Sequence, residues 1–151
     1  MRRIMVLLAT VAMMAAMLAM SGVAQAAPIN DKADAQCLKL AIETLGPGYN
    51  PSNYTFHGGT ADNDDFSLEP TDGPDVFCGF GGNDFITFLD EGDIFLGGAG
   101  NDAALSNRGT FYGGAGNDQV VFNSGTFDGG DGTFDSVIDN RGTISNVELV
   151  G

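Results

Sequence analysis

Short apolar runs alternate with glycine-rich polar stretches along the middle of this chain, and the alternation has a period of nine residues. Between Pro70 and Leu105 four nonapeptides follow one another without a break: PTDGPDVFC, GFGGNDFIT, FLDEGDIFL and GGAGNDAAL. Their first six places are rich in Gly, Asn, Asp and Pro, which favour turns, and their last three places are mostly apolar. The pattern predicts that each unit is a loop followed by a very short strand.

Strands this short predict a stacked architecture. A strand of about three residues cannot bury its apolar side chains alone, so successive units must stack on one another. Loops of every second unit then lie above each other at one edge, about 4.8 Å apart. We therefore expect an all-β fold, a parallel β-roll or β-solenoid of about five coils, over residues 57–151. The apolar residues expected to point inward are Phe77, Ile86, Phe95, Ala104 and Val120.

The sixth place of each nonapeptide holds an aspartate, namely Asp75, Asp84, Asp93 and Asp102. Stacking brings the carboxylates of alternate units together, and two of them about 5 Å apart repel by roughly 3 kcal/mol at an effective dielectric near 20. A bound cation reverses the sign of this interaction. Ca²⁺ suits the site because carboxylate and main-chain oxygens are its ligands, and one His and two Cys offer no competing soft site.

Two later units, GGAGNDAAL at Gly97 and GGAGNDQVV at Gly113, match every loop place of the pattern G-G-x-G-x-D-x-U-x, in which U is a large apolar residue. GFGGNDFIT at Gly79 misses one glycine. These residues resemble the hemolysin-type calcium-binding repeat, also called the RTX repeat. The resemblance implies several Ca²⁺ ions, about four to six, held between the loops of successive coils by Asp carboxylates and loop carbonyls. Carried over to this sequence, the ligands are Asp84, Asp102 and Asp118, with main-chain oxygens of Gly79, Gly81, Gly97, Ala99, Gly100, Gly113, Ala115 and Gly116.

Towards the C-terminus the pattern changes on one edge only, where segments of seven residues replace the nonapeptides. Three near copies, Asn107–Thr110, Asn123–Thr126 and Asn140–Thr143, are spaced 16 and 17 residues apart. We expect them to place Thr where Asp75 and Asp93 stood, so that Asn and Thr hydrogen bonds replace carboxylates on this edge. Calcium is then expected along one whole edge, and on the other only between Asp75 and Asp93.

The two ends of the array are irregular, as expected where a solenoid is capped. The segment 59–67 lines up with the repeat if Asp64 takes the aspartate place. At the other end Asp131 and Asp135 lie around an extra residue, and either is placed to reach the last ion. The final segment, TISNVELVG, has apolar alternation without loop chemistry and is expected to form a closing strand.

The N-terminal segment 1–26 has two arginines, an apolar stretch and then Ala24-Gln25-Ala26, the pattern of a secretory signal peptide cleaved before Ala27. An uncleaved membrane anchor is the alternative. Without this segment the chain has four basic and 20 acidic residues, and its net charge changes from −14 to −16. We expect a secreted or cell-envelope protein without a membrane span after cleavage, whose charge discourages binding to nucleic acid.

Residues 27–56 are expected to form an N-terminal cap and linker. Apolar spacing predicts a short amphipathic helix, with Asn30 or Asp31 as its N-cap and Gly46 as its C-cap. Such a helix would cover the open first coil and protect its edge from pairing with another chain.

The two cysteines fall on different predicted elements, Cys37 on the helix and Cys78 at the end of the first full nonapeptide. In an oxidising compartment a Cys37–Cys78 disulfide is the leading hypothesis, and it would link the cap to the roll. Two unpaired thiols remain the alternative.

Catalysis finds little support in this sequence. His57 is the single histidine, and no recognisable nucleophile motif surrounds a Ser or Cys. We interpret the chain as a secreted calcium-binding protein, not an enzyme, that folds on binding the ion. The alternatives are a calcium-stiffened adhesion or matrix protein that holds a surface partner, and a secreted hydrolase with an unrecognised site.

Overall fold

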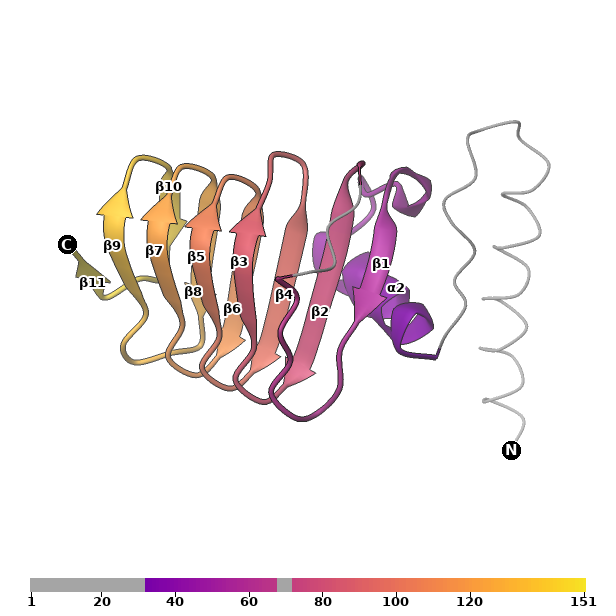
Figure 1. The fold of residues 1–151 in the computed structure, drawn as a ribbon, viewed down its shortest axis with the longest axis horizontal. Helices are drawn as coiled ribbons and strands as arrows, with labels where there is room; N and C mark the ends of the chain where they lie inside the picture. The colour runs from indigo at the N-terminus through magenta and orange to yellow at the C-terminus, as the bar shows by residue number, and fades with distance from the viewer. Residues whose placement is uncertain (1–31, 68–71) are drawn as a thin grey trace.

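The chain forms a parallel β-solenoid of about five turns with a helix at its N-terminal side, as the nine-residue pattern predicts (Figure 1). The computed structural model describes residues 32–67 and 72–151. The predicted signal peptide and the predicted N-caps Asn30 and Asp31 lie outside these residues. The elements, in chain order, are helix α2 (Lys32–Leu45), the 3₁₀ turn η1 (Pro51–Asn53) and strands β1 (Thr55–Gly58), β2 (Asp75–Gly81), β3 (Phe85–Leu89), β4 (Ile94–Ala99), β5 (Ala103–Asn107), β6 (Thr110–Ala115), β7 (Gln119–Asn123), β8 (Thr126–Gly130), β9 (Ser136–Asn140), β10 (Thr143–Ser145) and β11 (Leu149–Val150).

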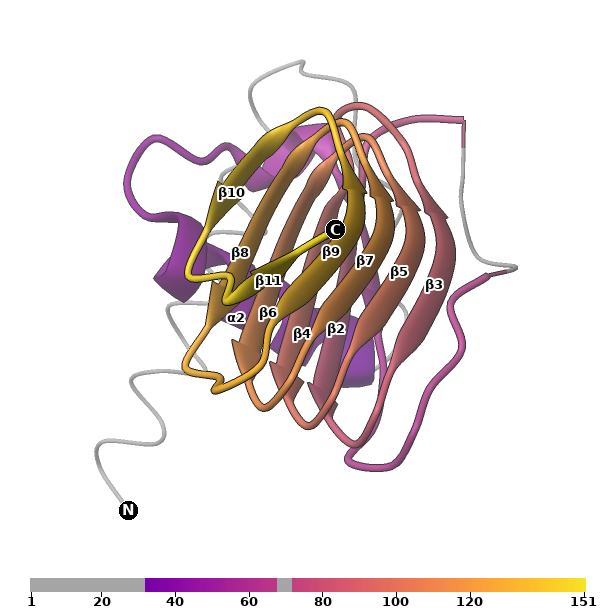
Figure 2. The same cartoon turned by 90° about the vertical axis from the view of Figure 1, so that its left-hand side faces the viewer.

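The strands form two parallel sheets that face each other across the solenoid. One has the order β1-β2-β4-β6-β8-β10 and the other β11-β9-β7-β5-β3. Figure 2 looks along the stack with the last coil nearest the viewer, and each coil repeats the outline of the one behind it. Val76 lies opposite Ile94, Ile94 opposite Thr110, and Thr126 opposite Thr143. The coil length therefore falls from 18 residues to 16 and then rises to 17.

Side chains from alternate places fill the interior. The inner face of the six-stranded sheet carries a column of phenylalanines, and the rings of Phe95 and Phe111 stack with centroids 4.8 Å apart. The facing sheet contributes aliphatic residues such as Ile86 and Val120, both buried. All five residues predicted to point inward are at most 1 % exposed, which confirms this part of the prediction.

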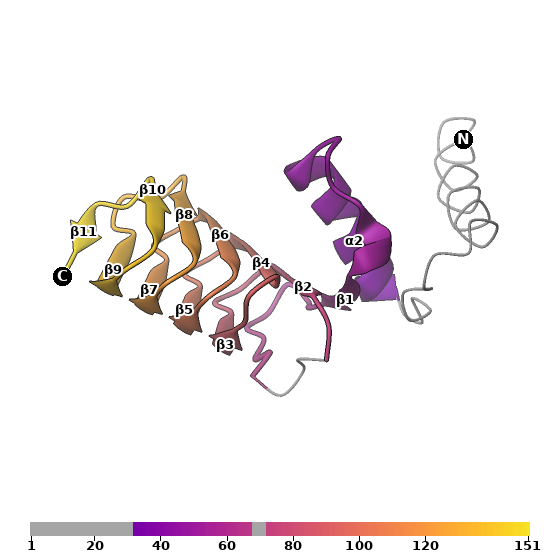
Figure 3. The ribbon, with the colours of Figure 1, turned by 90° about the horizontal axis from the view of Figure 1, so that it is seen from above.

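Helix α2 lies over the outer face of the six-stranded sheet at its N-terminal end (Figure 3). Its buried residues Cys37 and Ala41 pack with the outward side chains of β1, β2 and β4, among them Val76 and Leu96. At the predicted C-cap, Gly46 has a φ of +77° and its N–H bonds to the carbonyl of Ile42. In the part of the chain described, no helix is long and apolar enough to cross a bilayer.

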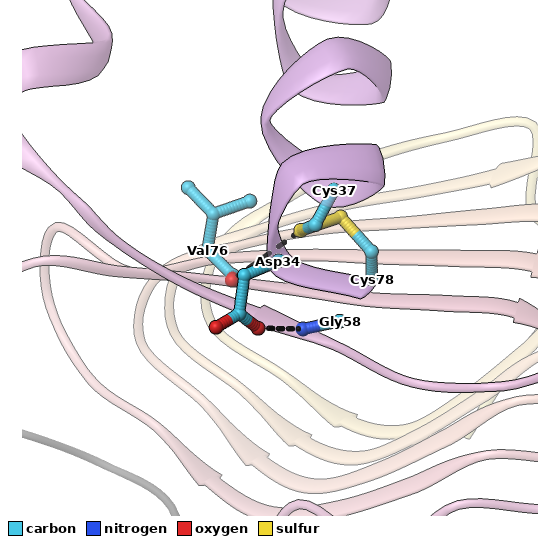
Figure 4. Close-up of a disulfide and its surroundings, with 5 residues drawn as sticks. All are labelled: Asp34, Cys37, Gly58, Val76 and Cys78. Atoms are coloured by element: carbon cyan, nitrogen blue, oxygen red, sulfur yellow. Dashed lines mark hydrogen bonds between the residues drawn. A yellow bond between two sulfur atoms is a disulfide. The ribbon is translucent and has the colours of Figure 1, made fainter. Parts of the chain in front are cut away.

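The helix is joined to the first coils in two ways (Figure 4). The carboxylate of Asp34 accepts a hydrogen bond of 2.9 Å from the Gly58 N–H, on the side of β1 that faces away from β2. A disulfide links Cys37 to Cys78, and both residues are fully buried. The helix thus covers the outer face of the first coils as well as part of their open edge.

Candidate metal-binding edge

One edge of the solenoid carries a continuous column of aspartates, each of which directly precedes a strand of the five-stranded sheet. Asp84, Asp102, Asp118 and Asp135 are at most 1 % exposed. The main-chain N–H groups of the first three each donate to Oδ1 of the aspartate in the next coil, at 2.7–2.8 Å. Asp64 joins the column at its start, because its N–H donates to Asp84 Oδ1. The structure thus brings five predicted ligands together in one row, which we call the aspartate column.

Four members of the aspartate column each keep one carboxylate oxygen without a donor. Across the described ranges, no group hydrogen-bonds to Oδ2 of Asp84, Asp102, Asp118 or Asp135, although all four atoms are buried. A buried ionised oxygen without a partner is costly. Burial raises the pKa of Asp84 and Asp102 to about 6 and that of Asp118 to about 7. The buried negative charge of the column is therefore compensated either by a bound cation or by protonation of the carboxylates.

Glycine at the first place of each loop leaves room for these oxygens. A Cβ on Gly97 would overlap both Asp102 Oδ2 and the carbonyl oxygen of Gly113 in the next coil. The same two kinds of oxygen converge on Gly79 and Gly113. A carboxylate oxygen and a main-chain oxygen from the neighbouring coil therefore meet at each of these glycines, with no side chain between them.

The other predicted main-chain ligands lie nearby in the same loops. Gly81, Ala99 and Ala115 pair in register in successive coils at the ends of β2, β4 and β6. Gly100 and Gly116 have φ values of +132° and +136°, which favour glycine, and a Cβ at either would overlap the carbonyl oxygen of a glycine in the preceding coil.

The chemistry of this edge fits a hard divalent cation. Carboxylate and main-chain carbonyl oxygens are the ligands that Ca²⁺ takes in proteins. Over residues 32–67 and 72–151, no three Asp, Glu, His or Cys side chains gather around one point. Main-chain oxygens are the further ligands that these loops offer.

A second column of hydrogen bonds, not predicted from the sequence, runs beside the aspartates. The N–H of Asn83 donates to Asn63 Oδ1, that of Asn101 to Asn83 Oδ1, and that of Asn117 to Asn101 Oδ1, at 2.7–2.8 Å. The signal was the asparagine that precedes the aspartate in each of these loops. These bonds join the loops of successive coils through protein groups alone.

The ends of the aspartate column differ from its middle. Asp64 takes the predicted place, but its Oδ2 accepts hydrogen bonds from the N–H and hydroxyl of Thr60. Of the two candidates at the far end, Asp135 lies in the column, while Asp131 is exposed.

On the opposite edge the carboxylates already have protein partners. Asp93 accepts hydrogen bonds from the N–H groups of Asp75 and Asp90, each at 3.0 Å. Asp75 Oδ1 lies 3.0 Å from Nε2 of His57, whose ring stacks on Phe77. An ion between Asp75 and Asp93 stays a prediction. Both carboxylate oxygens of Asp93 accept hydrogen bonds, unlike those of the four buried aspartates in the aspartate column.

The later coils of this edge correct the predicted register by one residue. Thr110 lies opposite Ile94, so Gly109 and not Thr110 takes the place of Asp93. The turn has lost two residues, and the threonine falls into the strand. The predicted asparagine bonds are present: Asn107 Nδ2 donates to Asn123 Oδ1, and Asn123 Nδ2 to Asn140 Oδ1, both at 2.8 Å.

Replacing Asn123 by alanine is expected to lower the free energy of unfolding by about 1–3 kcal/mol, because the buried Asn107 and the half-buried Asn140, in the two neighbouring coils, lose their hydrogen bonds. The loss should be equal with calcium and with chelator, since the later coils of this edge carry no carboxylate column. Urea unfolding of Asn123→Ala beside the exposed control Ser124→Ala measures it. A loss found only in calcium would contradict a metal-independent edge.

No protein-family model, curated protein or solved structure matches this chain. The fold and the edge together define a parallel β-solenoid with a buried carboxylate column, and its function is inferred from that chemistry.

Proposed function

We propose that this chain is a secreted calcium-binding protein, in which ions along the aspartate column hold adjacent coils together. The observation that supports this most directly is the set of four buried carboxylate oxygens without a donor in the described chain. A divalent cation would compensate their charge, and the resemblance of the loops to calcium-binding repeats points to the same ion.

The ligands would come from two coils at a time. Asp84, Asp102, Asp118 and Asp135 would supply carboxylate oxygens, and the loop glycines would supply carbonyl oxygens. Binding then couples to folding, because a site made from two coils does not exist until they stack. About four to six ions of low, extracellular-type affinity fit the number of loops. The Cys37–Cys78 disulfide suits an oxidising compartment.

A calcium titration followed by circular dichroism tests this proposal. In chelator at pH 7.5 we expect part of the β-sheet signal to be lost, and millimolar Ca²⁺ should restore it cooperatively. Mg²⁺ is the control ion, because it prefers a smaller octahedral site and should restore less. A full β-sheet signal in excess chelator that does not change with calcium would overturn the coupling of binding to folding.

A second candidate function, adhesion to a surface or matrix partner, is favoured by the outer face of the five-stranded sheet. Phe88, Phe122 and Ile138 expose 52–58 % of their surface there. Beside Phe122 lies a shallow groove of about 280 Å³ that Arg108 and Arg141 also line. Exposed aromatic residues beside arginines are typical of binding surfaces.

An array of glycans and matrix proteins, probed in calcium and in chelator, tests adhesion. We expect calcium-dependent retention that the double variant Phe88→Ser, Phe122→Ser abolishes. An array without retention of the wild-type chain would contradict this second function and leave calcium binding unaffected.

A further inference from the structure

The last residues of the chain repeat the loop chemistry of the coils in a shortened form. The sequence predicts a closing strand without loop chemistry over 143–151. The structure instead has two short strands, β10 and β11, joined by a tight turn in which Asn146 has a φ of +50°. Within this turn Glu148 Oε2 accepts a hydrogen bond of 2.7 Å from the Asp135 N–H. It is the bond that each aspartate of the column makes to the next one.

The main-chain oxygen of the repeat is reproduced as well. A Cβ on Gly129 would overlap the carbonyl oxygen of Asn146 and would lie 2.5 Å from Asp135 Oδ2. Gly97 has the same surroundings, made by Gly113 O and Asp102 Oδ2. Asn146 therefore stands in for the glycine of a further coil, and Glu148 for its aspartate.

The longer side chain of glutamate compensates for the shorter loop. In a full repeat the aspartate comes five positions after the glycine, as from Gly97 to Asp102, whereas Glu148 comes only two positions after Asn146. The extra methylene of Glu lets the carboxylate reach the same N–H. A hydrogen bond from Asn146 Nδ2 to Asp128 Oδ1, 2.7 Å long, holds the turn against β8.

An independent observation points to a ligand at this junction. Asp135 is fully buried, and its Oδ2 has no hydrogen-bond partner in the described chain. The neighbouring groups, Glu148 and Asp128, are also acidic, and the Asn146 carbonyl adds a further acceptor oxygen.

We propose that Asp135 and Glu148 form the terminal cation site of the aspartate column, completed by the main-chain oxygen of Asn146. This inference rests on the proposed calcium function and adds a site to it. A hard divalent cation is the expected occupant, because the converging atoms are carboxylate and carbonyl oxygens. Glu148 is thus a ligand rather than one of the solvating acidic residues of the surface.

The variant Glu148→Gln tests this site, because glutamine keeps an acceptor for the Asp135 N–H and removes the charge. Glu43→Gln, on the exposed side of α2, is the matched control. Equilibrium dialysis with radiolabelled calcium should find one ion fewer per chain in Glu148→Gln, or one site weakened at least tenfold, and no change in Glu43→Gln. Equal stoichiometry and affinity in both variants would overturn the terminal site.

A measurement on the wild-type chain decides the question if Glu148→Gln fails to fold. During a calcium titration followed by NMR, the amide resonances of Asp135 and Glu148 should shift together with that of Asp102. If only Asp102 shifts, the terminal site is wrong while calcium binding stands. A wild-type chain that binds no calcium at all would instead overturn the proposed function itself.

Discussion

An Asp102→Asn variant is expected to be less stable than the wild-type chain in calcium, yet more stable than it in chelator at pH 7.5. Asparagine keeps an oxygen that accepts the Asp84 N–H, so the 2.8 Å hydrogen bond between the coils survives. In calcium the variant loses a charged ligand in the middle of the column, between Asp84 and Asp118. In chelator it loses a buried carboxylate whose Oδ2 has no donor among the residues described, which relieves the metal-free fold.

We expect the calcium affinity of Asp102→Asn to fall by roughly a hundredfold, equivalent to about 3 kcal/mol. Calcium titration gives the affinity, and thermal unfolding in calcium and in chelator gives the two changes in stability. The control is Asp75→Asn on the other edge, where His57 already contacts the carboxylate. If both variants lose the same affinity, the asymmetry between the two edges is wrong.

The metal-free chain is expected to lose stability as the pH rises from about 4 to about 7.5. Burial raises the pKa of Asp84 and Asp102 from 3.8 to about 6 and that of Asp118 to about 7, and the charges of neighbouring carboxylates add to the increase at Asp84 and Asp118. In this range the folded chain binds more protons than the unfolded chain, so the free energy of unfolding falls with rising pH. The contribution is full below 3.8 and is lost as the pH passes 6 to 7.

Melting temperatures in chelator at pH 5 and pH 7.5 measure this effect, and we expect a difference on the order of 10 °C, since 1 kcal/mol shifts the midpoint by about 4 °C in a domain of this size. Calcium should abolish the difference, because it replaces the protons on the column and releases them on binding. A metal-free chain whose stability rises with pH over this range would contradict an uncompensated carboxylate column.

Features that repeat could be predicted from the sequence, because the period of nine fixes which side chains share a face and an edge. It gave the two sheets, the inward Phe77 and Phe95, and the column through Asp84 and Asp102. The disulfide partners also followed, since Cys37 and Cys78 are the two cysteines of the chain.

Features outside the period could not be predicted in the same way. Glu148 follows a shorter loop with a different side chain, so no spacing marks it. The one-residue change of register at Thr110 depends on which positions of the turn are deleted. A single sequence does not show where such a deletion falls. The cover provided by α2 did leave a signal, because the outward residues Cys78 of β2 and Leu96 of β4 are apolar, whereas Tyr112 and Asp128 occupy the equivalent places in β6 and β8.

The aspartate column and the asparagine bonds beside it donate in opposite directions. The earlier coil gives the N–H of its aspartate to the later one, and the later coil returns the N–H of its asparagine. Every coil on this edge therefore presents the same donor, an aspartate N–H, and the same acceptor, an asparagine Oδ1, to the coil that follows it. One coil can therefore replace another in the stack. Excising the 16 residues 94–109 would bring the N–H of Asp84 to Asp118 Oδ1 and that of Asn117 to Asn83 Oδ1, with every bond of the edge remade.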